Sequence, residues 1–167
     1  HRSSKHNQHA FAPGPGQLDW ASQPDPFRRY EGAEVVPLIK TAPTEKPTFS
    51  EALIPNKVSA CPLNLESVSQ LFFDCLALSA WKSFQGSKWA LRVNPSSGNL
   101  HPTEGYLVCG PVQGLTDKPS VFHYSPKTHG LEVRAHFSME TWEKMRLSDD
   151  TIFVGLSSIH WREAWKY

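Results

Sequence analysis

The chain has 167 residues, of which 39% are hydrophobic and 20% charged, and its formal net charge is +1 at pH 7. This length predicts one domain of ordinary size, and the hydrophobic content excludes a disordered chain. The charges alternate in sign without a basic block or an acidic tail, so nothing indicates binding to nucleic acid or an anionic membrane. No apolar run approaches the ~20 residues that span a bilayer, and no signal peptide is recognisable. The three cysteines lack CxxC spacing, which favours reduced thiols and a cytoplasmic protein.

Residues 1–60 form the first predicted region, an extended arm rich in proline. Proline fixes φ and removes an amide donor, so regular helices and strands are disfavoured here. The aromatic residues Trp20, Phe27 and Tyr30 predict that the arm is anchored on a surface, with another subunit as one alternative.

Residues 61–167 form the second region, which opens with a predicted helix at 65–80. Asn64 is a natural N-cap for this helix because its side chain can accept a hydrogen bond from an amide of the first turn. Apolar side chains recur at steps of three and four residues, and we expect one broad buried face that includes Leu71 and Cys75.

Short apolar and alternating segments then predict several strands and two further helices. Their side chains, together with Trp81, Phe84 and Trp89, are interpreted as core residues. The pattern predicts an α+β domain in which an antiparallel-leaning sheet is flanked by helices. The predicted strands are 88–93, 104–110, 120–124, 131–137 and 151–158, the last fully buried, and the predicted helices begin after Ser138 and at 159.

The stretch between Arg92 and the strand at 104–110 is the strongest candidate site. Small residues leave the backbone amides here unshielded, and Gly98 permits positive φ, so a planar heterocycle can approach closely. Asn99 carries both a donor and an acceptor for the polar edge of such a ring, and Arg92 can neutralise a phosphate or an anionic ring. The alternative is an ordinary turn between two prolines. The candidate residues are Arg92, Pro95, Ser96, Ser97, Gly98 and Asn99.

A second cluster, at the start of the chain, has the composition of a phosphate site. Arg2, Ser4, Lys5 and His6 bring positive charge and a hydroxyl donor together. The alternative is a solvated terminus. The eight histidines show neither the H-E-x-x-H pattern nor cysteine–histidine spacing, so no metal site is predicted.

These segments carry a resemblance to a known family. "RSSKH" at 2–6, "NPSSGNLHPTEGYLV" at 94–108 and "HWREAWKY" at 160–167 resemble, in this order, motifs of the nitroreductase family of flavin enzymes. In detail the chain is similar to the amino-terminal part of the SagB-type, or McbC-like, dehydrogenase branch. "LDWASQPDPFRRYEGA" at 18–33 is typical of the double-module members of that branch.

The resemblance implies an FMN-dependent oxidoreductase with the nitroreductase-like α+β fold. Its cofactor would lie between the subunits of a homodimer or between this part and a second nitroreductase-like module. Arg2, Ser4 and His6 would hold the FMN phosphate, with His6 in place of the second arginine of the family motif. The 96–99 segment would line the flavin ring, and Lys166 and Tyr167 would assist proton removal.

Two function hypotheses follow. The first is an oxidoreductase that reduces a nitro compound or quinone with NAD(P)H, or oxidises an azoline ring in a peptide. The second is a flavin-less scaffold that keeps the fold for dimerisation or partner binding. Family members continue beyond the last matching motif into further flavin-contacting elements. Either other chains supply these elements, or this part is a fragment that is expected to hold flavin weakly and to be inactive alone.

Overall fold

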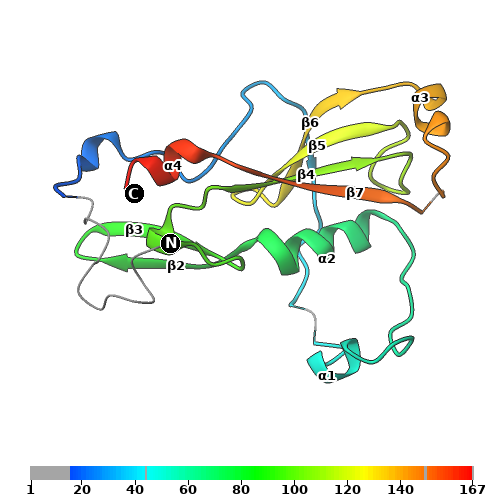
Figure 1. Ribbon diagram of the computed structural model, residues 1–167, viewed down its shortest axis with the longest axis horizontal. Coiled ribbons are helices and arrows are strands. Elements are labelled where there is room, and N and C mark those ends of the chain that lie inside the picture. The colour runs from blue at the N-terminus through cyan, green and yellow to red at the C-terminus, as the bar shows by residue number, and fades with distance from the viewer. Residues whose placement is uncertain (1–15, 44, 149, 167) are drawn as a thin grey trace, which may run out of the picture.

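The structure is a computed structural model that describes residues 16–43, 45–148 and 150–166. A five-stranded antiparallel sheet in the order β1-β6-β5-β4-β7 lies beside a separate β2–β3 hairpin (Figure 1). The sheet strands are β1 (Val35–Pro37), β4 (Thr103–Cys109), β5 (Ser120–Ser125), β6 (Gly130–His136) and β7 (Ile152–Ser158), and the hairpin strands are β2 (Leu78–Phe84) and β3 (Ser87–Arg92). The helices are α1 (Phe49–Ala52), α2 (Leu65–Leu76), α3 (Met139–Lys144) and α4 (His160–Ala164), with short 3-10 turns at Trp20–Ser22 and Ser97–Asn99. The predicted α+β architecture, an antiparallel sheet flanked by helices, is confirmed.

Helix α2 begins where its capping residue predicts. The Asn64 side chain accepts a hydrogen bond from the amide of Ser67 at 2.9 Å, and the Ser67 hydroxyl accepts one from the amide of Asn64 at 3.0 Å. This reciprocal pair satisfies two amides that the first turn leaves without helical partners.

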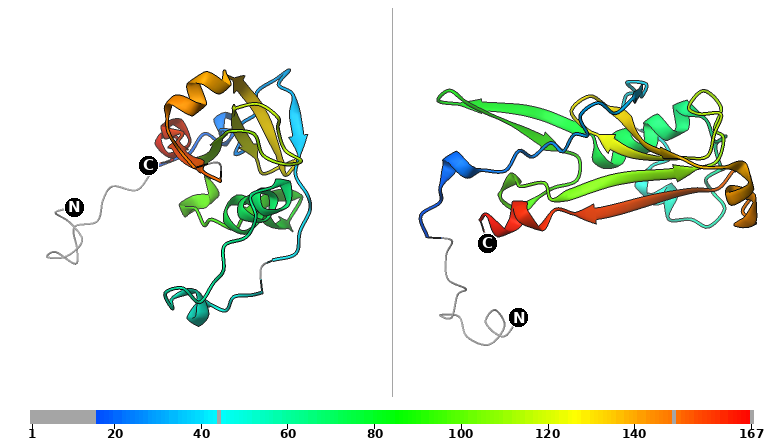
Figure 2. Two further views of the ribbon diagram at one scale, coloured as in Figure 1. Left: turned by 90° about the vertical axis from the view of Figure 1, so that its right-hand side faces the viewer. Right: turned by 90° about the horizontal axis from the view of Figure 1, so that it is seen from above.

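The core lies between α2 and one face of the sheet (Figure 2). The rings of Phe72 and Tyr124 stack with their centroids 4.6 Å apart. Leu76 lies so close to Gly105 on β4 that a Cβ at Gly105 would collide with it. The glycine in "EGYLV" therefore allows α2 to approach the sheet closely.

The predicted helix at 65–80 is too long. Ala77 is already extended, and β2 begins at Leu78 because it pairs along its length with β3. The β2–β3 hairpin does not pair with the five-stranded sheet and extends beyond it (Figure 1). Trp81 and Phe84 are accordingly 47% and 65% exposed, and their assignment to the core is wrong.

The predicted burial of the 151–158 strand is also wrong. β7 pairs with β4, and no other strand of the described residues pairs with its far side. As an edge strand it exposes apolar side chains on both of its faces, including Phe153, Val154 and Leu156. Leu71 and Cys75 on α2 are exposed as well, on the side of the helix that faces away from the core.

The described part of the arm contacts the rest of the chain at several places, through the strand β1 and through its aromatic side chains. The Trp20 ring meets Trp165 edge-on with centroids 5.4 Å apart, and Phe27 lies 6.2 Å from Trp81. The hydroxyl of Tyr30 lies 3.1 Å from that of a sheet residue, Tyr106. None of the helices within the described residues combines the length and apolarity that crossing a membrane requires.

Candidate functional site

The candidate loop, residues 93–102, connects β3 to β4 and is tied at both ends. At its start the amide of Val93 donates to the carbonyl of Ala77, just after α2, at 2.9 Å. At its end the carbonyl of Pro102 accepts from the amide of Ile159, just before α4, at 2.9 Å. The loop therefore lies where α2, the hairpin and α4 meet.

The backbone of the loop takes the conformation that its glycine allows. Gly98 has φ +64°, and the left-handed region is also occupied by Asn99 at +58° and His101 at +47°. Ser96 anchors this turn, because its carbonyl accepts from the amide of Asn99 at 3.1 Å and its hydroxyl accepts from that of His101 at 2.9 Å. Ser97 and Gly98 are exposed at the tip. The predicted positive φ at Gly98 is confirmed.

The carboxamide of Asn99 is oriented from within the loop. Its Oδ1 lies 2.7 Å from Nε2 of His101, a ring that is only 2% exposed. Burial, and then the nearby charge of Arg92, lower the pKa of His101. A neutral imidazole that carries its proton on Nε2 satisfies this contact.

An apolar groove of about 470 Å³ lies directly beside the loop. α2 forms one wall, β7 forms the other, and Asn94 and Pro95 close one end. The exposed side chains that the sequence assigned to the core, on α2 and on β7, therefore line a hollow. The lining residues are Leu71, Phe72, Cys75, Leu76, Asn94, Pro95, Thr103, Val154 and Leu156.

Asn94, which lines this groove, also carries an unusual buried polar atom. Its Oδ1 is buried and has no hydrogen-bond partner among the described residues. A buried acceptor without a donor is costly, and native proteins rarely keep one without a reason. Sequence reasoning missed Asn94, although it directly precedes the candidate Pro95.

A cleft of about 330 Å³ lies on another side of the loop, between the arm and the hairpin. Residues 23–27 of the arm form one wall, and Trp81, Lys88 and Trp89 belong to the hairpin wall. Asn99 reaches this cleft from the loop, and the ammonium of Lys88 lies 4.8 Å from the Trp81 ring centroid.

Arg92 lies behind the loop, 6% exposed. Its Nη1 donates to the carbonyl of Thr103 at 3.3 Å and its Nη2 to that of Pro26, while its Nε has no partner among the described residues. Burial is the main cause that lowers its pKa, and the carboxylate of Glu104 opposes that shift. The predicted contact of Arg92 with a phosphate or an anionic ring stays a prediction.

A chain of buried charges runs from α4 through the sheet, and sequence reasoning missed it. The guanidinium of Arg162 donates to Oε1 of Glu104, whose Oε2 lies 2.7 Å from Nε2 of His123. The other ring nitrogen of His123 lies 2.8 Å from Oε2 of Glu132. Both ring nitrogens of His123 are thus within hydrogen-bond distance of a carboxylate, and the four side chains form one continuous buried chain. In the sequence, this buried chain is indicated only by charged residues that occur inside otherwise apolar strands.

The remaining predicted site residues are not brought to the loop by the described contacts. Arg2, Ser4 and His6, the predicted phosphate ligands, lie outside the described residues, as does Tyr167. Lys166 is half-buried just after α4, and its amide donates to the carbonyl of a helix residue at 3.0 Å.

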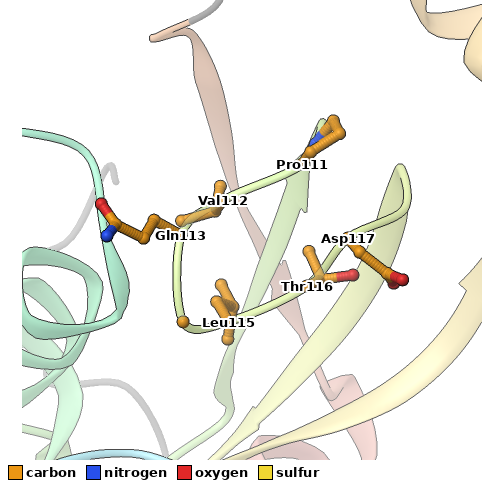
Figure 3. A pocket seen from close by; sticks show the side chains of 7 residues that line it. Pro111, Val112, Gln113, Leu115, Thr116 and Asp117 are labelled. Carbon is orange, nitrogen blue, oxygen red and sulfur yellow. The ribbon is translucent and has the colours of Figure 1, made fainter.

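Within the described residues, neither a further hollow nor a metal-binding group of side chains adds a second candidate site. A hollow of about 550 Å³ lies inside the β4–β5 connection, at the other end of β4 from the candidate loop, with Val112 and Leu115 among its side chains (Figure 3). Its only ionisable lining residue is Asp117. Within residues 16–43, 45–148 and 150–166, no group of three or more His, Cys, Asp or Glu side chains is arranged to hold a metal ion.

Comparisons with known proteins bear on the fold. No protein-family model matches the chain, and no curated protein matches it. Among solved structures it is similar to a "putative nitroreductase" from Anabaena variabilis ATCC 29413, with a TM-score of 0.63 and 24% identity over 89% of this chain. The match spans 29% of the length of that protein. The chain therefore has a nitroreductase-like α+β fold.

Proposed function

We propose that this chain is part of an FMN-dependent oxidoreductase of the nitroreductase type, with the flavin ring in the groove beside the 94–99 loop. The proposal is supported by the fold and by the sequence resemblance to the SagB-type branch. The observation that carries it is the apolar groove of about 470 Å³, which Asn94 and Pro95 of the loop line together with α2 and β7.

The residues present fit such a ligand. Small-molecule sites are concave, mostly apolar and between about 300 and 1,000 Å³, with a few polar groups that fix orientation. Asn94 and Pro95 would lie against one side of the ring. Ser97 and Gly98 are exposed at the tip of the same loop, outside the residues that line the groove.

Bound FMN would supply hydride transfer. The loop would orient the ring, and its amides together with the buried positive charge of Arg92 would favour the negative charge of the reduced state. Lys166 and Tyr167 would assist proton removal, by the resemblance to azoline-oxidising members. Asn99 would present its carboxamide to a reactant in the arm–hairpin cleft.

The complete assembly requires more than the described residues. Arg2, Ser4 and His6 would hold the phosphate, and a second copy or a second nitroreductase-like module would cover the groove. The substrate would be a nitro compound or quinone reduced with NAD(P)H, or an azoline ring in a peptide.

Titration of the full-length protein with FMN, followed by flavin fluorescence, tests the proposal. We expect Gly98→Val to weaken FMN binding at least about tenfold, because the side chain blocks close approach to the loop. Asn94→Leu should weaken FMN binding while raising the free energy of unfolding by about 1 kcal/mol, because it removes an unsatisfied buried acceptor.

Gly86→Val is the matched control for Gly98→Val. Gly86 also has positive φ, at +80°, but it lies at the tip of the hairpin with open space around it. Both valine variants should lose similar stability from backbone strain, and only Gly98→Val should lose affinity. A full-length protein that takes up no FMN would reject the enzyme and favour the scaffold hypothesis.

A further inference from the structure

Two buried arginines each connect the arm to the end of the candidate loop. Arg162 donates from Nε to the carbonyl of Asp25 on the arm at 3.1 Å, and from Nη1 to the carbonyl of His101 at 2.6 Å. Arg92 donates to the next carbonyl on the arm, that of Pro26, and to that of Thr103 at 3.3 Å. The two guanidinium groups thus bridge the same two segments side by side.

Proline explains why these carbonyls need such donors. Pro24 and Pro26 have no amide hydrogen, and the residue before a proline is held extended, so this part of the arm cannot pair as a strand. At the end of the loop, Pro102 likewise has no amide hydrogen to donate. A buried carbonyl without a donor is unfavourable, and an arginine fork can serve two carbonyls at once.

Both arginines are buried close to Glu104, a residue of the sheet strand β4. Arg162 and Arg92 are 3% and 6% exposed, and Glu104 is 2% exposed. Glu104 accepts from Arg162, and its charge also acts on Arg92. The guanidinium groups therefore lie against β4, while the arm carbonyls of Asp25 and Pro26 that they hold belong to an irregular segment.

The contact of Arg162 falls on the strained part of the loop. His101 has φ +47°, which a histidine seldom adopts, and its ring orients Asn99. The bond from Arg162 to the His101 carbonyl stabilises that conformation. The same guanidinium fixes Asp25, which lines the cleft that Asn99 also reaches.

We propose that Arg92 and Arg162 are positioning residues that form a clasp between the arm and residues 101–103, where the candidate loop joins β4, so that the loop keeps its ligand-binding geometry only while the arm is docked. The clasp couples the arm to the loop. Weakening the hydrogen bonds of either arginine should therefore make both segments more mobile. The link to ligand binding rests on the proposed function, whereas the coupling itself does not.

Hydrogen exchange followed by mass spectrometry on the flavin-free full chain tests the coupling. Arg162→Lys and Arg92→Lys keep the charge but replace the fork by a single ammonium. In each variant we expect exchange to quicken roughly tenfold or more in peptides covering 19–34 and 94–101, the size of effect that losing a charged hydrogen bond gives. Peptides covering 122–124 in the sheet should keep their wild-type exchange.

Arg29→Lys is the matched control, because Arg29 is an exposed arginine on the same arm. It should leave exchange unchanged in both segments. Faster exchange in only one of the peptides 19–34 and 94–101, or in neither, would overturn the clasp. An equal rise in the sheet peptide 122–124 would overturn it as well. If Arg162→Lys does not fold, Arg92→Lys decides between the same outcomes.

Titration of the same variants with FMN separates the two proposals. With the clasp and the proposed function both correct, each lysine variant binds FMN roughly tenfold or more weakly than Arg29→Lys does. A wild-type protein that binds no FMN rejects the proposed function, and the exchange result still decides the clasp. Wild-type FMN affinity in both lysine variants, with quickened loop exchange, would overturn the link from the clasp to the ligand.

Discussion

His123 lies between two acidic side chains with no water-exposed surface of its own. Its two nitrogens are 2.7 and 2.8 Å from the carboxylates of Glu104 and Glu132, and the ring is fully buried. The rings of Tyr30 and Tyr106 pack against it with centroids 5.1 and 5.2 Å away. The ring provides a hydrogen-bond partner for both carboxylates, and burying such groups without partners is costly.

His123→Leu is expected to lower the free energy of unfolding by about 3–5 kcal/mol, because two buried carboxylates each lose a side-chain hydrogen-bond partner. Urea unfolding measures the loss. His160→Leu, at an exposed position on α4, should change stability by less than about 0.5 kcal/mol. Equal stability of the wild-type protein and His123→Leu would mean that the carboxylates do not depend on the ring.

At the scale of elements, amphipathic patterns correctly indicated helices and strands but not what covers each face. The far side of α2 and both faces of β7 are apolar, and in this structure they form a groove and an exposed edge. An uncharged edge strand offers unpaired backbone groups to any neighbouring chain. β7 is therefore the element most prone to pair with other molecules.

Leu156→Lys is expected to reduce concentration-dependent association, because a lysine on an edge strand opposes strand pairing. Leu156 is 66% exposed, so the free energy of unfolding should change by less than about 0.5 kcal/mol. Analytical ultracentrifugation over a range of concentrations measures the effect. Met139→Lys, at an exposed position on α3, is the control and should associate like the wild-type protein. An unchanged association in Leu156→Lys would exclude the β7 edge as its cause.

At the scale of the whole molecule, buried histidines make stability depend on pH. Burial lowers the pKa of both His101 and His129, and His129 is held between the hydroxyl of Tyr124 and the carbonyl of Ile39. As pH falls below the ordinary histidine value of about 6.5, the unfolded chain takes up protons that the folded chain does not. Their contribution to stability is thus complete above that value and lost below it.

We therefore expect the free energy of unfolding to decrease as the pH is lowered from about 7 to about 5. The decrease should be less steep in His129→Gln. Urea unfolding at a series of pH values measures both slopes. His160→Gln is the control, because this exposed histidine should leave the slope unchanged. A His129→Gln slope equal to that of the wild-type protein would remove His129 as a source.

The sequence by itself determined the features that depend on neighbouring residues. The Asn64 cap, the positive φ of Gly98 and the hairpin of β5 and β6 each follow from side chains within a few positions of one another. The α+β class followed as well, because it rests on the order of such local elements.

Only the tertiary structure decided which apolar surfaces are covered and which charges meet. β7 has the composition of a buried strand, but burial depends on neighbours on both sides, and it lies at an edge. Glu104 gains its partners from positions 123 and 162, and Arg92 bonds a carbonyl at position 26. Hydrogen bonds and desolvation act over a few ångströms in space, whatever the separation along the chain, and no local pattern encodes such a meeting.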